Sequence, residues 1–256
     1  MKKLVLVLLA MLCVGAVSAK QFENPMLNLT VPSGLEQGEM YLVIGHKFLQ
    51  TLYHDSTASY DLKNDFFAVL NYGSNVKIGL RGMIWQGIEA NVAYVSKHRE
   101  KIAGLSYVLK TPDIGFITQM DIQFINFQDM PADINPVKQN LFYLLSVESI
   151  PFLDDRVAVG VNAGYDSLEK QAGLGIGISV ETIRHFRLLA DYYPVINPAG
   201  GRTTGCYGFG VKIDTNGHQF VIKAGNSDEI GSRDLMHGTT NNNMYIGFDI
   251  MRLISF

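Results

Sequence analysis

The stretch Thr118-Gln-Met-Asp-Ile-Gln-Phe-Ile-Asn126 alternates polar and apolar residues almost throughout. Its polar side carries Gln119, Asp121 and Gln123, and its apolar side carries Met120, Ile122 and Phe124. Successive side chains of a strand point to opposite faces, so this stretch predicts a β-strand with one polar and one apolar face. The fold then depends on which of the two faces lies inside the protein.

The same alternation recurs between Gln37 and Phe256 in segments of about ten residues, the length that a tilted barrel strand needs to cross a bilayer. The predicted segments are residues 39–48, 75–84, 88–97, 101–110, 114–127, 140–149, 155–165, 171–181, 186–193, 205–213, 218–226 and 243–253. Short connections with turn residues alternate with mostly longer loops, as in outer-membrane barrels, which use even strand numbers. We therefore predict an all-β chain that folds as a single antiparallel transmembrane β-barrel of about 12 strands.

The alternation alone fits two kinds of barrel, one with its apolar face toward lipid and one soluble barrel with that face inside. Charged residues make up 18% of the chain, and its mean hydropathy is +0.11. Both values favour a membrane barrel, because soluble proteins expose more charge. The apolar face is thus expected to contact lipid, and the polar face to line a lumen.

The N-terminus predicts export. Lys2 and Lys3 precede an apolar run that closes on Val17-Ser18-Ala19, which is the pattern of a signal peptide over residues 1–19. Residues 20–36 are then expected to form a periplasmic N-terminal segment, and residues 37–256 the outer-membrane β-barrel. Only Cys206 follows the leader, so no intramolecular disulfide is expected, and no basic cluster indicates nucleic-acid binding.

The polar face carries a balanced set of charges. The predicted lumen-facing cations are Lys47, Lys77, Arg81, Arg156, Arg187, Lys212 and Lys223, and the anions are Glu89, Asp121, Glu148, Glu181, Asp191 and Asp249. An unpaired charge in a narrow lumen is unfavourable, so we expect these charges to pair across the interior. Balanced charges do not indicate the single-sign constriction of an ion-selective pore.

Two further features bear on whether the lumen is open. Glycines alternate within the segment 171–181, and we expect them to make room at the inner face for opposite side chains or an inward-folded loop. In the long loop 49–74, the residues Asp65, Phe66, Phe67 and Leu70 are a candidate plug, with an external lid as an equal alternative.

Catalytic and metal-binding patterns are not found. None of the six histidines stands in the Ser–His context of the twelve-stranded outer-membrane phospholipases, and none shows zinc-ligand spacing. We expect no enzyme activity, no cofactor and no metal site. Asn28-Leu29-Thr30 matches the N-glycosylation pattern, which we interpret as chance.

Two stretches are familiar. Gly38–Phe48, GEMYLVIGHKF, and Gly73–Ile84 after Asn64-Asp-Phe-Phe67 resemble the first elements of an uncharacterised family of predicted outer-membrane β-barrels from Bacteroidetes-type bacteria. Ala68 stands where that family has a glycine. The resemblance implies a fold and a location in the bacterial outer membrane, and it supplies no activity. The end of the chain at Phe256 resembles a C-terminal sorting signal, which implies contact with the barrel-assembly machinery.

The function expected from these patterns is a narrow or gated passage for small solutes in a barrel surrounded by outer-membrane lipid. A closed structural or partner-docking barrel without transport is the first alternative. A soluble secreted ligand-binding β-barrel is the second.

Overall fold

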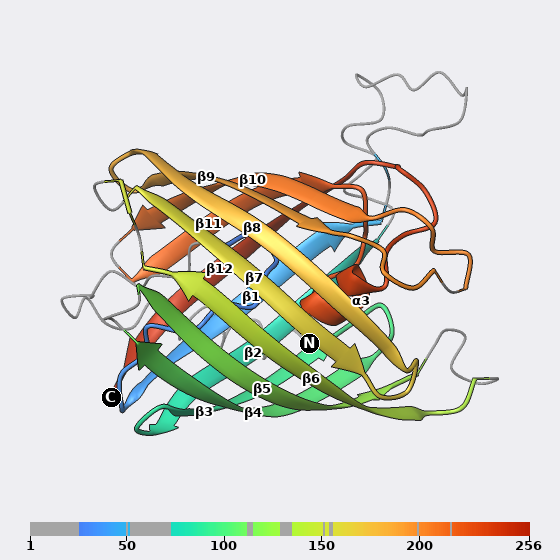
Figure 1. The fold of residues 1–256 in the computed structure, drawn as a ribbon, viewed down its shortest axis with the longest axis horizontal. Coiled ribbons are helices and arrows are strands. Elements are labelled where there is room, and N and C mark those ends of the chain that lie inside the picture. Colours follow the sequence, from blue (N-terminus) through green and yellow to red (C-terminus); the bar gives the residue numbers. More distant parts are fainter. Residues whose placement is uncertain are drawn as a thin grey trace.

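The computed structural model describes residues 26–49, 51, 73–111, 115–128, 135–150, 152–153, 156–198, 200–215 and 217–256. Within them, twelve strands form a closed antiparallel barrel in which each strand pairs with its neighbours in sequence (Figure 1). The strands are β1 Glu39–Phe48, β2 Ser74–Trp85, β3 Ile88–Val95, β4 Glu100–Thr111, β5 Phe116–Phe127, β6 Lys138–Ser149, β7 Val157–Asp166, β8 Gln171–Ile183, β9 Phe186–Tyr193, β10 Cys206–Thr215, β11 His218–Gly225 and β12 Tyr245–Ser255.

The predicted strand pattern is confirmed. Each of the twelve predicted segments overlaps one observed strand, and the segments 39–48 and 186–193 coincide with β1 and β9. The first and last strands close the barrel, with Glu39 opposite Ser255 and Lys47 opposite Gly247. The amide of Phe256 also donates to the carbonyl of Gly38 at 3.0 Å, so the last residue of the chain lies beside the start of β1.

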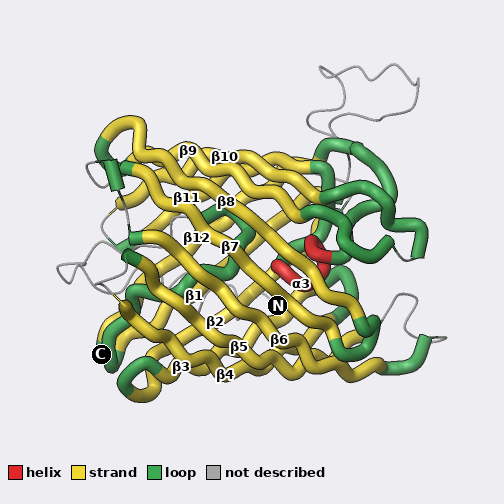
Figure 2. The backbone as a smooth tube through the Cα atoms, viewed as in Figure 1, coloured by secondary structure: helices red, strands yellow, loops and turns green. Residues whose placement is uncertain are grey.

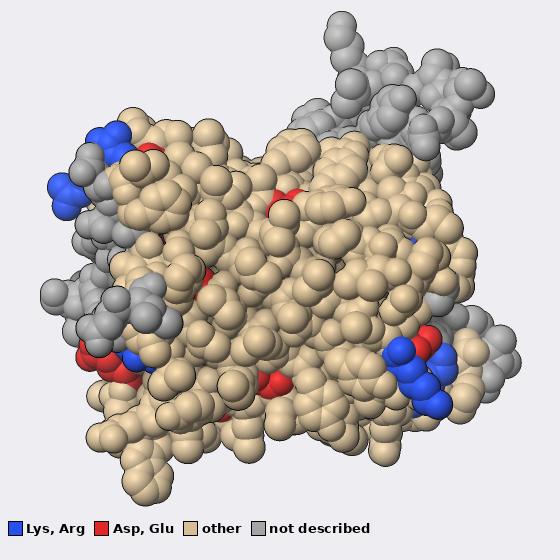
Figure 3. Space-filling view, viewed as in Figure 1, with Lys and Arg blue, Asp and Glu red and all other residues tan. Residues whose placement is uncertain are grey.

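The apolar face of the strands is on the outside. In β5, Met120, Ile122 and Phe124 are 60%, 52% and 44% exposed, whereas Gln119 and Asp121 are 0% and 2% exposed. Lysines and arginines gather toward the two ends of the molecule in Figure 3, and the wall between them is almost free of them on that face. The outer wall therefore has the surface of a barrel that contacts lipid.

The connections are sorted between the two ends of the barrel (Figure 2). The even-to-odd connections at residues 86–87, 112–115, 150–156, 184–185 and 216–217 are short and lie at the end that carries the C-terminus. The strand ends that flank the longest odd-to-even connections, 49–73, 128–137, 194–205 and 226–244, lie at the opposite end. We call these the turn end and the loop end. The short helix α3, Ser232–Met236, belongs to the last connection, and no helix in the described part of the chain is long enough to cross a membrane.

Candidate functional site in the barrel lumen

The structure places twelve of the thirteen predicted charges on the inner side of the wall. They alternate with exposed residues along their strands, and they are Lys47, Lys77, Arg81, Glu89, Asp121, Glu148, Glu181, Arg187, Asp191, Lys212, Lys223 and Asp249. The prediction that Arg156 faces the lumen is wrong. Its side chain is exposed, and its amide donates to the carbonyl of Phe152 at 3.2 Å, because the chain there is still in the tight turn before β7.

The wall charges pair between neighbouring strands. Arg81 Nε contacts Glu89 Oε2 at 2.6 Å, Lys223 Nζ contacts Asp249 Oδ2 at 2.6 Å, and Arg187 contacts Glu181 at 2.7 Å. The expectation that these charges pair is confirmed, but the expectation that they pair across the interior is wrong, because each pair joins adjacent strands of the wall. Side chains on adjacent strands are about 5 Å apart, which is within reach of such pairs.

What crosses the lumen is backbone. Residues 26–36, which we call the N-terminal segment, lie inside the barrel, with Met26, Leu27, Leu29, Val31 and Leu35 all at most 6% exposed. The expectation that this part of the segment 20–36 is periplasmic is thus wrong. Its apolar side chains alternate with Asn28 and Thr30, and burial of such side chains from water favours the lumen over the periplasm.

The N-terminal segment packs on glycines. Gly160 and Gly177 are opposite each other in β7 and β8, and a Cβ at Gly177 would lie 3.0 Å from Cδ1 of Leu29. A Cβ at Gly160 would lie 3.3 Å from Cε of Met26. The predicted role of the inner-face glycines is confirmed, because their missing side chains leave room for this segment.

Hydrogen bonds hold the same segment to three strands. Asn162 in β7 accepts the amide of Thr30 at 3.0 Å and donates to its carbonyl at 2.7 Å. Asp191 in β9 accepts the amide of Asn28 at 2.9 Å. The Asn28 side chain accepts from Lys223 Nζ at 3.2 Å.

A second element enters the lumen from the loop end. Residues 226–244, between β11 and β12, fold inward, and we call them the lumen loop. All five residues of α3 are buried, and the loop reaches a second glycine pair, Gly164 and Gly173. A Cβ at Gly173 would lie 2.3 Å from Cβ of Met236, so a side chain there would collide with α3.

Arg233 fixes α3 to the wall. Its guanidinium contacts Glu100 at 2.5 Å and Asp234 at 2.6 Å, and it lies 4.8 Å from the ring centroid of Phe127. Burial raises the pKa of the Asp234 carboxyl, but the charges of Arg233 and His237 outweigh it and hold that pKa below its usual range. Asp234 is therefore an anion that balances Arg233 inside the lumen.

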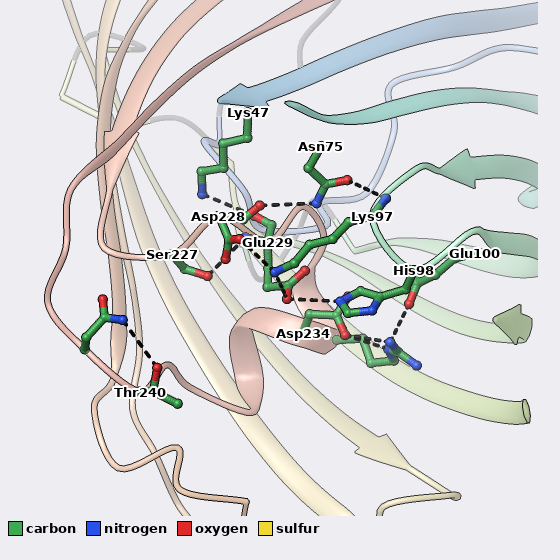
Figure 4. A network of polar contacts seen from close by, with 12 residues as sticks. Lys47, Asn75, Lys97, His98, Glu100, Ser227, Asp228, Glu229, Asp234 and Thr240 are labelled. Atoms are coloured by element: carbon green, nitrogen blue, oxygen red, sulfur yellow. Dashed lines mark hydrogen bonds and ion pairs between the residues drawn. The ribbon is translucent and has the colours of Figure 1, made fainter. Parts of the chain in front are cut away.

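The start of the lumen loop binds the β3–β4 turn (Figure 4). Lys97 Nζ contacts Glu229 at 2.6 Å and Asp228 at 2.8 Å, and Nε2 of His98 lies 3.3 Å from Glu229. The hydrogen bond to Glu229 raises the pKa of His98 above its ordinary value, although partial burial opposes the shift. Burial lowers the pKa of Lys97, but the carboxylates of Glu229 and Asp228 outweigh it, so the net shift is upward.

Two cavities lie on either side of α3. The inner chamber, of about 180 Å³, lies between the N-terminal segment and the β1–β5 side of the wall, and Lys77, Arg81 and Asp121 contribute to its lining. The outer mouth, of about 260 Å³, is lined by residues that include His98, Arg202 and His237. Arg233 and Asp234 line both cavities, so α3 borders each of them.

The candidate plug at Asp65, Phe66, Phe67 and Leu70 lies outside the described residues. Within the described part of the chain, no group of three or more His, Cys, Asp or Glu side chains is arranged to hold a metal ion.

The sequence analysis missed the residues that fix the lumen loop. Glu100 begins β4 one residue before the predicted strand, and it was therefore not counted as a wall residue. Arg233, Asp234 and Glu229 stand in a loop without periodicity. The available signal was composition, since Ile230, Leu235 and Met236 are large apolar residues within an otherwise polar connection.

Comparisons with known proteins agree with this architecture. Residues 158–254 match the family model described as Membrane bound beta barrel domain (DUF5777). The match covers β7 to β12, whereas the motifs that resemble a barrel family lie in the first third of the chain. No curated protein matches the chain.

The solved structure of the KdgM porin shares the fold. The KdgM porin superposes with a TM-score of 0.50 at 10% identity, over 84% of this chain and 99% of the porin. For the NanC porin the TM-score is 0.43 at 9% identity, over 85% of this chain and 99% of the porin. For the outer membrane phospholipase A from Escherichia coli the TM-score is 0.44 at 12% identity, over 84% of this chain and 92% of the phospholipase. This chain is a membrane β-barrel with the fold of outer-membrane porins, and the soluble alternative is wrong because the large apolar side chains face outward.

Proposed function

We propose that this chain is a bacterial outer-membrane barrel that gives small solutes a narrow, gated passage, with the lumen loop as the gate. The observation that carries the proposal is that Arg233 and Asp234 line both the outer mouth and the inner chamber. The residues that the two cavities share belong to a five-residue helix, which ion pairs of Arg233 hold to the wall. A small movement of α3 would join them.

The position of the N-terminal segment also supports a gated passage. The segment packs on the glycines of β7 and β8, which leaves the chamber on the opposite side of the lumen, along β1 to β5. The chamber is lined by apolar side chains together with charges of both signs, such as Lys77 and Asp121, and the mixed charges favour small polar solutes over ions of one sign. The proposal includes removal of residues 1–19 as a signal peptide, assembly through the C-terminal strand ending at Phe256, and no enzymatic activity.

Conductance of the refolded chain in a planar bilayer tests the proposal. Residues 20–256 are expected to open rarely, because the lumen loop is held by several ion pairs. Replacing residues 228–242 with a four-residue turn removes the gate and is expected to give a steady conductance. A shortened chain that inserts, resists heat unfolding on a gel and yet stays silent would refute the gated passage.

A closed barrel with a structural or docking role is the second candidate. One observation favours it, because the N-terminal segment is hydrogen-bonded to β7 and β9 within the lumen and narrows any path. Silence of both the complete and the shortened chain, with correct insertion, is the result that this second candidate predicts.

A further inference from the structure

The inner wall from β7 to β10 makes contacts that are not needed for a passage. Three of its features are those of a peptide-binding groove: a side chain that hydrogen-bonds to backbone groups, a floor of glycines, and charged side chains at the edge, Asp191 and Lys223. The first feature is Asn162, whose amide contacts both the N–H and the C=O of Thr30, at 3.0 and 2.7 Å. An amide side chain can pair in this way with the backbone of any extended residue.

Two further polar contacts are also to backbone, one from the wall and one from α3. Asp191 accepts the amide of Asn28 at 2.9 Å, and Ser232 donates to the carbonyl of Asn28 at 3.3 Å. Contacts with backbone groups do not depend on the identity of the bound residue, which is how proteins bind extended peptides of varied sequence. Asn162 itself is 1% exposed, so it is a built part of the wall.

The floor of the groove has pockets for three apolar side chains. The opposed pair Gly160 and Gly177 lies under Met26 and Leu29, and Gly208 and Gly210 in β10 lie under Leu27. A Cβ at Gly208 would lie 2.9 Å from Cδ2 of Leu27. The chain bends over residues 27–29, so the consecutive residues Met26 and Leu27 both pack on the wall, and the pockets select a bent peptide with apolar side chains in this spacing.

We propose that this wall is a binding groove for short peptides with apolar side chains in the spacing of Met26, Leu27 and Leu29, and that residues 26–31 occupy it as a tethered ligand. The groove binds a free peptide of the same pattern when the tethered segment is removed from it. A linked ligand has a high effective concentration, so the complete chain excludes free peptides. The inference does not depend on conduction, and its test measures binding alone.

The test uses the complete mature chain. The double substitution Leu27→Asp and Leu29→Asp puts charges against apolar pockets and is expected to expel the segment. A fluorescently labelled peptide with the sequence of residues 26–35 is titrated into this variant and into the unsubstituted chain, with anisotropy as the readout. The expected result is at least about tenfold tighter binding to the variant, as linkage predicts for a vacated site.

Two controls identify the groove. In the variant, Asn162→Ala removes two hydrogen bonds and is expected to weaken binding about tenfold, whereas Asn140→Ala, a buried amide that contacts the β7–β8 turn, leaves it unchanged. A labelled peptide that carries the same two aspartates is expected not to bind. If the double variant does not fold, Asn28→Pro replaces it, since proline removes the N–H that Asp191 accepts and the side-chain oxygen that accepts from Lys223.

A folded variant that binds the peptide no more tightly than the unsubstituted chain would overturn the proposal. Binding that is equally strong after Asn162→Ala would overturn it as well, because the peptide would then lie elsewhere. Neither result bears on the gated passage, which is tested by conductance.

Discussion

Arg233→Met is expected to open the barrel by releasing the lumen loop. Methionine keeps an apolar contact with Phe127 but removes the charge that faces Glu100 and Asp234. These three side chains are 10%, 2% and 9% exposed, so the ion pairs are well shielded from water. Removing one partner of a buried pair costs about 3–5 kcal/mol, because the remaining charge stays buried without compensation.

That penalty falls mainly on the docked loop, since release of the loop returns the carboxylates to water. At 1.4 kcal/mol per factor of ten, the ratio of docked to released loop falls about a hundredfold to a few thousandfold. The assay is single-channel recording, in which the open fraction rises. Adding Glu100→Gln to the Arg233→Met variant removes the carboxylate that lost its partner. This second substitution is expected to lower the open fraction part of the way back to that of the unsubstituted chain.

The matched control for this prediction is Arg99→Met. Arg99 is exposed in the β3–β4 turn at the same end of the barrel, so its substitution makes the same change in net charge without touching α3. Its open fraction should equal that of the unsubstituted chain. The reasoning is refuted if Arg233→Met inserts correctly and shows the same open fraction as Arg99→Met.

The remaining predictions test the wall, the loop end and the glycine floor. Ile122→Arg, on the lipid face, is expected to destabilise the membrane-inserted barrel by about 2–4 kcal/mol, whereas Asp121→Leu is tolerated; urea titration in lipid vesicles would show the reverse if the faces were exchanged. Because the hydrogen bond to Glu229 raises the pKa of His98, that contact stabilises closure below the unfolded value of about 6.5 and is lost as pH rises through the folded pKa. As pH rises through the folded pKa of His98, the open fraction should therefore increase more steeply in the unsubstituted chain than in His98→Gln. The same dependence of open fraction on pH in both chains would count against the contact. Gly173→Val is expected to displace α3 and increase conductance, since its Cβ would lie 2.3 Å from that of the methionine that ends the helix; an unchanged open fraction would mean that the loop is not the gate.

The wall could be predicted from the sequence because each strand carries its own evidence. In the stretch around Asp121, the period of two fixes which residues share a face, and a low charge content indicates which face meets lipid. The glycines of β8 were also informative, since a missing side chain on an inner face predicts a neighbour close to the backbone. Those glycines did not reveal which neighbour occupies the space.

The filling of the lumen could not be predicted in the same way. Leu27, Leu29 and Val31 alternate with polar residues, but six residues are too few to distinguish a lumen segment from a short linker. Arg233 contacts Glu100, which is 133 positions away in the sequence. That contact depends on how deeply the lumen loop folds into the barrel, and the alternation of residues along the strands does not predict this depth. Arg156 shows the limit at strand ends, where a turn that extends one residue further removes a charge from the wall.

The position of the two lumen elements in the chain has a consequence for the order of synthesis. The N-terminal segment precedes β1 and emerges first, whereas the lumen loop joins β11 to β12 and emerges almost last. An incomplete chain of ten strands would thus have its N-terminal segment but neither the β1–β12 seam nor the lumen loop. The final hairpin supplies both at once, so closing the wall of the barrel and filling its lumen from the loop end are a single late event in the life of the chain.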